Sequence, residues 1–135
     1  MNKINIIKKA SIYKSTFIGA LFLNEIKTTY HCCNCNEKII FEIIPFKTGR
    51  YFGELLQNKI LSETTIIKFK MASRSVINKH SGNLLVNDLP TLYSLEVCKS
   101  CEHNHIVIFG LGEKQPSMWV CDISGVWSYE KIDKK

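Results

Sequence analysis

The chain alternates apolar and polar residues over many short runs, and this pattern predicts a mainly β (α+β) protein with an antiparallel sheet. In the run IKTTY, for example, Ile26, Thr28 and Tyr30 fall on one face of a strand. A bend near Gly19 and another near Asn24 are expected in the first long run. The runs that predict strands are 12–30, 38–44, 64–71, 92–97, 105–112, 118–123 and 126–132.

Three interruptions of this pattern predict other kinds of structure. Residues 50–61 (RYFGELLQNKIL) space their apolar side chains three and four apart, which predicts one short amphipathic helix that begins near Thr48. Gly110 and Gly112 predict a bulge or an edge strand. Residues 124–125 (Ser-Gly) predict a tight turn between the last two strands.

Two pairs of cysteines, each with its members three residues apart, stand between predicted strands. They are Cys32 with Cys35, and Cys98 with Cys101. Two thiolates at i and i+3 of a tight turn can both face one metal ion at about 2.3 Å, and two such turns complete a tetrahedron. Asn36 follows the first pair, where a residue that tolerates a positive φ is useful, and Glu102 holds the matching place after the second pair.

These motifs resemble the knuckles of zinc-ribbon proteins, in which two such turns on β-hairpins share one zinc ion. The resemblance covers residues 28–43 and 93–109, and it implies a structural Zn²⁺ held by all four cysteines. Residues 45–90 are then expected to form an inserted lobe with the short helix, within a single domain of residues 1–135. Iron in a rubredoxin-like site and disulfides in an exported protein are the alternatives.

The other cysteines and the neighbouring histidines are expected to play lesser roles. Cys33 is expected to point away from the metal, and Cys121 to be a small core residue. His31 and His103 flank the cysteine pairs and could replace a cysteine as a ligand, although we expect a supporting or surface position for both.

The charge of the chain bears on whether it binds nucleic acid, and its hydropathy bears on its location in the cell. The formal net charge is +6, but only Arg50 and Arg74 are arginines, and no long basic run occurs. Because lysine lacks the bidentate geometry of arginine, we expect the lysines mainly to cover a solvated surface. The apolar run Phe17–Leu23 is too short to span a bilayer and lacks a following signal-cleavage site, so it predicts a buried strand. A cytoplasmic protein with reduced cysteines is therefore expected.

No catalytic motif is evident in the sequence. His103, Asn104 and His105 spell the name of a nuclease motif, but they are consecutive and no metal-binding helix follows them. The segment Gly110–Glu113 is too short for a phosphate-binding loop, and the acidic residues show no paired spacing. We therefore expect a binding protein rather than an enzyme.

The segment 112–130 is rich in the residue types that protein interfaces favour. Its predicted partner-binding residues are Glu113, Trp119, Trp127 and Tyr129. The alternative position for both tryptophans is the protein core.

Two classes of function remain open on this basis. Small size, a single domain, no catalytic motif and an Ile-, Lys- and Asn-rich composition resemble, by type alone, the immunity proteins of bacterial toxin–immunity systems, including contact-dependent inhibition. That resemblance implies a protein that binds and neutralises a cognate toxin, although the positive charge argues against a basic nuclease as that toxin. The alternative is a nucleic-acid-binding zinc ribbon, favoured by the basic charge and the aromatic residues. No membrane partner is expected.

Overall fold

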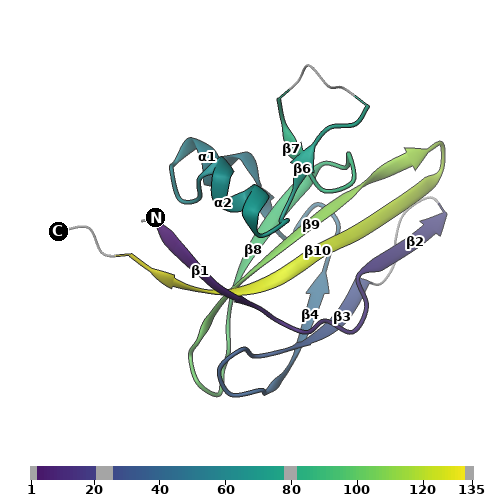
Figure 1. The fold of residues 1–135 in the computed structure, drawn as a ribbon. Coiled ribbons are helices and arrows are strands. Elements are labelled where there is room, and N and C mark those ends of the chain that lie inside the picture. Colours follow the sequence, from purple (N-terminus) through teal and green to yellow (C-terminus); the bar gives the residue numbers. More distant parts are fainter. Residues whose placement is uncertain (1–2, 21–25, 78–81, 133–135) are drawn as a thin grey trace.

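The computed structural model describes residues 3–20, 26–77 and 82–132, which form three layers. The middle layer is an antiparallel sheet in the order β1-β10-β9-β8-β5, and β2 pairs with the N-terminal part of β10 (Figure 1). The strands of this main sheet are β1 (Ile4–Lys9), β2 (Thr16–Ala20), β5 (Arg50–Tyr51), β8 (Thr91–Val97), β9 (Asn104–Gln115) and β10 (Met118–Lys131). The prediction of a mainly β protein is confirmed.

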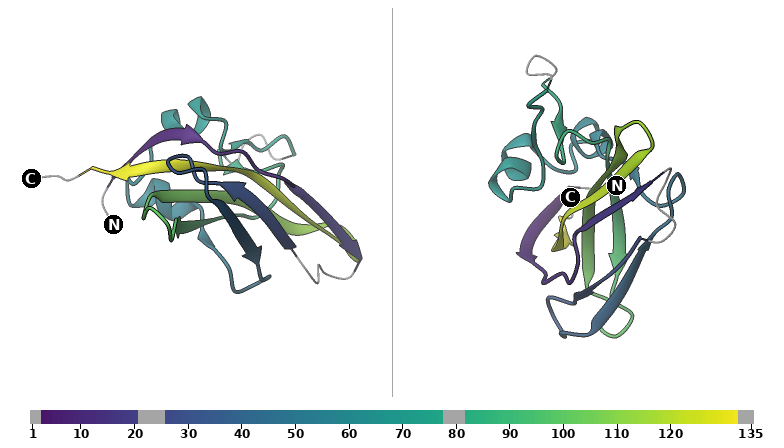
Figure 2. Two further views of the ribbon diagram at one scale, coloured as in Figure 1. Left: turned by 90° about the horizontal axis from the view of Figure 1, so that it is seen from below. Right: turned by 90° about the vertical axis from the view of Figure 1, so that its right-hand side faces the viewer.

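The two outer layers lie on opposite faces of the main sheet (Figure 2). One is a hairpin of β3 (Ile26–His31) and β4 (Lys38–Ile43), which pair along their whole length. The other is a helical lobe that holds α1 (Gly53–Gln57) and α2 (Glu63–Lys68). The short strands β6 (Ser73–Arg74) and β7 (Leu84–Leu85) pair with each other in the same lobe.

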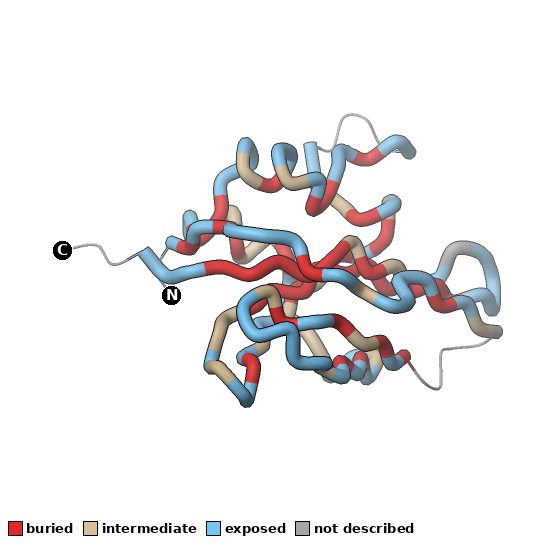
Figure 3. The backbone as a smooth tube through the Cα atoms, turned by 60° about the horizontal axis from the view of Figure 1, so that its bottom comes forward, coloured by how far each residue is buried: buried red, intermediate tan, exposed pale blue. Residues whose placement is uncertain are grey.

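Strand β9 shows why the layers arrange themselves in this way. Its Ile106 and Ile108 pack on the helical lobe, whereas Val107 and Phe109 pack on the β3–β4 hairpin. All four side chains are fully buried. A continuous β-branched run is typical of a strand covered on both faces, and the buried residues concentrate where the sheet passes between the outer layers (Figure 3).

Strand β10 carries a β-bulge where a tight turn was predicted. Ile123 pairs with Phe109 and Gly125 with Ile108, so Ser124 is an extra residue on β10 and the strand continues past it. The extra residue reverses the alternation of faces. Side chains before the bulge, such as Ile123, face the hairpin, whereas Trp127 faces the helical lobe.

The predicted strand at 64–71 is wrong, because most of it forms α2. The Ser62 hydroxyl accepts a hydrogen bond from the Thr65 N–H at 3.1 Å and caps the helix. Ile66 and Phe69, three residues apart, then pack on the core, and this helical spacing outweighs the two-residue alternation. The described part of the lobe thus has two helices instead of one, and the first begins at Gly53 because Arg50–Tyr51 pair with β8.

The glycines of β9 mark a close approach rather than an edge. Strand β9 lies between β8 and β10 in the sheet. A Cβ on Gly110 would lie 2.8 Å from the Leu89 Cβ and 2.9 Å from the Val86 carbonyl oxygen. Glycine at this position therefore lets the 86–90 loop pack directly on the strand.

The apolar run Phe17–Leu23 is only partly a buried strand. Phe17 of β2 is buried, but Ile18 is 65% exposed, and positions 21–25, including the expected bend near Asn24, lie outside the described residues. No helix in the described part of the chain has the length and apolar character that crossing a membrane requires.

Candidate metal centre

The first cysteine pair forms the turn of the β3–β4 hairpin, here called knuckle 1 (residues 32–36). The Cys32 N–H donates to the Glu37 carbonyl at 2.9 Å, and the Asn36 N–H donates back to the Cys32 carbonyl at 3.0 Å. Asn36 has φ 64°, the left-handed conformation expected for it. The turn therefore closes as the spacing predicts, at the end of a hairpin.

The second pair forms the turn between β8 and β9, here called knuckle 2 (residues 98–102), and it repeats these bonds. The Cys98 N–H donates to the His103 carbonyl at 3.0 Å, and the Glu102 N–H donates to the Cys98 carbonyl at 2.7 Å. Glu102 adopts φ 62° although glutamate gains nothing from that conformation. The two turns thus have one backbone geometry with different residues at the left-handed position.

The knuckles bring four sulfur atoms together. The Sγ atoms of Cys32, Cys35, Cys98 and Cys101 all lie within 4.8 Å of one another. Sulfurs bound to zinc at about 2.3 Å in a tetrahedron are about 3.8 Å apart. Two contacts run between the knuckles, at 3.5 Å from Cys32 Sγ to Cys101 Sγ and 3.6 Å from Cys35 Sγ to Cys98 Sγ, which is too long for disulfides. The arrangement fits one metal ion that ties both hairpins together.

Burial and neighbouring groups affect the four thiols unequally. Burial raises the pKa of the Cys32 thiol, whereas a hydrogen bond from the Asn34 side chain lowers the pKa of Cys101 to about 6. The Glu37 backbone N–H favours the thiolate of Cys35, but desolvation and the neighbouring thiols outweigh it and raise the pKa of Cys35 to about 12. A bound metal must therefore displace protons from some of these sulfurs at neutral pH.

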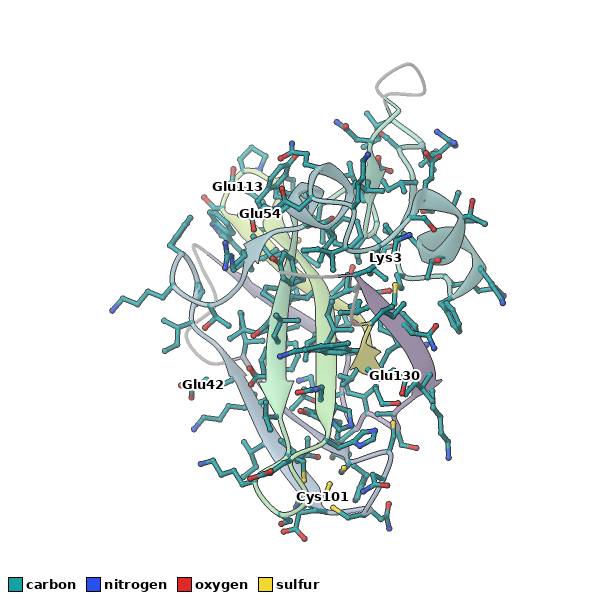
Figure 4. All side chains as sticks on the ribbon, turned by 90° about the vertical axis from the view of Figure 1, so that its left-hand side faces the viewer. Lys3, Glu42, Glu54, Cys101, Glu113 and Glu130 are labelled. Atoms are coloured by element: carbon teal, nitrogen blue, oxygen red, sulfur yellow. The ribbon has the colours of Figure 1, made fainter. Side chains whose placement is uncertain are left out.

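The four sulfurs differ in their access to solvent. Cys32 and Cys98 are buried, Cys101 is half-buried and Cys35 is exposed (Figure 4 labels Cys101, at one end of the molecule). An ion held by all four thiolates has no vacant coordination position for a substrate or an activated water molecule. The donor set fits a structural metal centre.

The neighbouring cysteines and histidines lie outside the sulfur cluster, as expected for Cys33, His31 and His103. The Cys33 Sγ lies 3.6 Å from the Lys8 carbonyl oxygen, and the His31 side chain is exposed. Cys121 is fully buried in the core, and burial raises its pKa to about 12. The expected core role of Cys121 is confirmed.

His105 is a supporting residue that the sequence did not identify. Its Nε2 accepts a hydrogen bond from the Cys33 N–H at 3.2 Å, so β9 holds knuckle 1 through this imidazole. The imidazole ring is fully buried, and its centroid lies 5.5 Å from that of the Tyr30 ring. Burial lowers the pKa of His105. Among the described residues, neither His105 Nδ1 nor the Tyr30 hydroxyl has a hydrogen-bond partner. Only the contact across the fold reveals this role.

The predicted partner-binding residues divide into two groups. Trp127 and Tyr129 are 1% and 3% exposed, so they belong to the core and their prediction as surface residues is wrong. The reason is that outer layers cover both faces of this part of the sheet, and the bulge at Ser124 directs both side chains toward the helical lobe instead of the hairpin. Trp119 and Glu113 are opposite each other on β10 and β9, with Trp119 half-buried and Glu113 exposed.

An exposed aromatic side chain completes the surface at Trp119. Phe46, in the loop after β4, packs edge-on against Trp119 with ring centroids 6.0 Å apart and is 84% exposed. Its φ of 68° is unusual for a bulky residue and costs conformational energy. We call Phe46, Trp119 and Glu113 the Phe46–Trp119 surface.

A groove of about 700 Å³ between the helical lobe and the β2–β10 pair does not include the cysteines. Its charged groups are mostly paired: Asp122 accepts a hydrogen bond from Asn87 Nδ2 at 2.9 Å, and Arg74 binds Glu63. Among the described lining residues no second carboxylate accompanies Asp122. The groove therefore lacks the pair of acids that general acid–base catalysis often uses.

Comparison of the chain with protein-family models, with curated proteins and with solved structures finds no significant match, so the four-cysteine cluster and its two hairpins are the features from which a function has to be argued.

Proposed function

We propose that this is a non-catalytic binding protein in which a structural zinc ion fixes a β-scaffold that presents a surface to another protein. The observation that carries the proposal is the cluster of four sulfurs contributed equally by two hairpin turns. Four thiolates satisfy zinc completely and hold the turns together without leaving a reactive position. Such a site contributes folding free energy rather than catalysis.

Metal analysis of the purified protein tests the zinc part of the proposal. We expect one zinc per chain by elemental analysis, lost in Cys98→Ser and retained in Cys33→Ser, because Cys33 lies outside the cluster. If the analysis found one iron per chain and the protein had the colour of ferric thiolates, the site would be a rubredoxin-like iron centre and not a zinc site. Protein that contains no metal but two disulfides would refute a metal centre.

The Phe46–Trp119 surface supports the protein-binding part. Aromatic side chains at the centre of a patch with a charged neighbour are typical of protein interfaces. Phe46 keeps a strained φ in a turn that the Lys47 and Thr48 N–H groups close by donating to the Ile44 carbonyl, and this turn leaves 84% of the residue exposed. Strained exposed residues of this kind are often binding residues.

The partner class to test first is a toxin encoded next to this protein, which the resemblance to immunity proteins implies. We expect the two proteins to co-purify and Phe46→Gly to abolish the complex. Glycine accepts the positive φ, so this variant should keep or gain stability, which separates binding from folding. Tyr51→Gly is the matched control, because Tyr51 is also exposed, at 60%, but lies on β5. Failure of any stable complex to form would contradict the toxin-binding hypothesis.

Nucleic-acid binding is the second candidate, and one surface favours it. Tyr13 is 85% exposed beside a hollow that it lines with His31 and Lys38, on the outer side of the β3–β4 hairpin. An exposed aromatic ring beside a lysine can stack on an unpaired base while the lysine binds the phosphate backbone. The test is fluorescence anisotropy with labelled single-stranded RNA at several salt concentrations. Affinity whose logarithm falls linearly with the logarithm of salt concentration, and that Tyr13→Ala weakens, would favour this function.

A further inference from the structure

Strand β4 has an open edge, in contrast to its partner β3. The far edge of β3 is covered by the segment that joins β1 to β2: the Tyr13 N–H donates to the Thr29 carbonyl at 2.9 Å, and the His31 N–H donates to the Ser11 carbonyl at 3.2 Å. In the described part of the chain, β4 pairs with β3 alone. Open edges of this kind are available for pairing with another strand.

The alternation of backbone groups shows which residues of β4 face this edge. The bond from the Cys32 N–H to the Glu37 carbonyl fixes the hydrogen-bonded pairs of the hairpin, and these recur at every second residue. Ile39, Phe41 and Ile43 therefore direct their N–H and C=O groups toward β3. Lys38, Ile40 and Glu42 direct theirs toward the open edge.

The side chains of the same three residues form a self-complementary sequence. Lys38, Ile40 and Glu42 are all exposed, and Ile40 is 69% exposed although it is apolar. Read in opposite directions from Ile40, the strand offers a cation on one side and a carboxylate on the other. Figure 4 shows Glu42 at the outer margin of the molecule, on the β4 side. A second copy of the same strand, running antiparallel, matches this order.

We propose that β4 pairs antiparallel with β4 of a second copy of this chain, with Ile40 facing Ile40 on a two-fold axis. In this register, Lys38 of each copy lies opposite Glu42 of the other, and all the outward-directed backbone groups of Lys38, Ile40 and Glu42 find partners. Opposite charges and apolar side chains facing each other across an antiparallel pair both stabilise it. The contact is isologous, as two-fold symmetry requires, and it joins two hairpins into one four-stranded sheet.

Two further features fit this register. Glu42 already lies 3.4 Å from Lys27 on β3, so in the dimer it would lie between that lysine and Lys38 of the other copy. The Ile44 N–H is occupied by the Thr48 hydroxyl at 2.9 Å, which ends the open edge just past Glu42. This pairing is independent of the proposed binding function, because it involves none of the residues of the Phe46–Trp119 surface.

Analytical ultracentrifugation of the full-length, zinc-loaded protein over a range of concentrations tests the dimer. We expect a reversible, concentration-dependent dimer, because pairing of one strand buries less than the roughly 1,200 Å² typical of stable interfaces. Lys38→Glu and Glu42→Lys should each weaken dimerisation at least about tenfold, since each places like charges opposite one another in both symmetric contacts.

Mixing the two variants tests directly whether Lys38 of one copy lies opposite Glu42 of the other. An equimolar mixture of Lys38→Glu and Glu42→Lys chains should dimerise again, because every opposed position then joins a carboxylate to an ammonium group. Lys131→Glu is the control: it makes the same charge change as Lys38→Glu, but at the exposed end of β10, and it should leave the dimer intact. A monomer at all concentrations, a dimer unaffected by either single variant, or variants that fail to dimerise together would each overturn the proposal. A β4 edge that is protected from hydrogen exchange only when a different protein is added would instead assign it to that partner.

Discussion

The two hairpins that carry the four cysteines have turns of the same geometry, but they pack differently against the rest of the protein. Both knuckles have the same pair of backbone hydrogen bonds and a left-handed residue after the second cysteine. Hairpin β8–β9 belongs to the main sheet, where β9 is buried on both faces, whereas β3–β4 is an outer layer that packs with one face only. Local sequence therefore determines the turn, and the layers around it determine how firmly the turn is held.

This contrast indicates what the metal contributes. We expect the core to support knuckle 2 whether or not a metal is bound, because β9 is buried on both faces. The β3–β4 hairpin that carries knuckle 1 is attached by one apolar face, by the backbone hydrogen bonds of β3 to Ser11 and Tyr13, by the Cys33–His105 hydrogen bond and by the sulfur cluster. We expect metal binding mainly to stabilise the attachment of the outer hairpin.

The largest expected effect is the loss of a ligand from the better-supported hairpin. Cys98→Ser should remove zinc and lower the free energy of unfolding by about 3–5 kcal/mol, because loss of a structural metal is among the most damaging single changes. Chemical denaturation followed by tryptophan fluorescence measures this, since Trp127 is buried in the core. Cys33→Ser is the matched control and should cost less than about 1 kcal/mol. Equal stability of Cys98→Ser and the wild type would refute a structural metal centre.

Metal removal should separate the two hairpins. When a chelator strips zinc from the intact protein, hydrogen exchange at amides of β3 and β4 should become faster by at least about tenfold more than exchange at amides in the centre of β9, which open only when the whole protein unfolds. The cause is the one-sided packing of the outer hairpin. Mass spectrometry of exchange-labelled peptides measures both regions in one sample. Uniform loss of protection over both hairpins would show that the metal stabilises the whole fold instead.

The contact that joins the hairpins should make stability depend on pH. Burial lowers the pKa of His105 below its usual 6.5, so the folded state favours neutral imidazole and the unfolded state binds the proton more readily. Stability from this residue is present above about pH 6.5 and is lost as the pH falls from there toward the lowered pKa. His103 lies nearby, with its ring centroid 5.8 Å away, and its positive charge acts in the same direction.

The variant His105→Gln isolates this effect. The glutamine carbonyl oxygen can still accept from the Cys33 N–H, but the side chain does not titrate. The unfolding free energy of zinc-loaded wild type, measured from pH 7.5 to 5.5, should fall more steeply than that of the variant. Because zinc thiolates also lose metal in acid, the difference between the two proteins is the relevant quantity. Parallel pH profiles would show that His105 remains neutral in both states.

Features that depend on short sequence spacing could be predicted, and the metal centre is one of them. Two cysteines three residues apart fix a turn, and the turn predicts its flanking strands, so both hairpins and the four-sulfur cluster follow from the sequence. The alternation of Ile26, Thr28 and Tyr30 is likewise confirmed, because one face of β3 is buried. In each case the pattern that permits the prediction spans only a few neighbouring residues, although the two cysteine pairs themselves lie far apart along the chain.

Features that depend on contacts across the fold could not be predicted. Trp127 is a core residue because outer layers cover both faces of β10, and the bulge at Ser124, where a Ser-Gly pair equally indicates a turn, decides on which layer it packs. The apolar residues of 64–71 fit both a strand and a helix until the Ser62 cap and the lobe's core select the helix. The open edge of β4 can be recognised only when the pairing of all the described strands is known, because an edge is defined by the lack of a second neighbour.

The smallest expected effect on stability comes from substitutions at the residue with a positive φ in each knuckle, Asn36 and Glu102. Asn36 tolerates a positive φ, whereas Glu102 adopts the same conformation at a cost. Asn36→Ala should therefore destabilise the protein by about 0.5–1 kcal/mol, and Glu102→Gly should stabilise it by about the same amount, because glycine adopts a positive φ without a clash. Thermal unfolding of zinc-loaded protein measures both. If Glu102→Gly lowered the unfolding temperature, the glutamate side chain itself would have to contribute to knuckle 2, and the two turns would then differ in more than their surroundings.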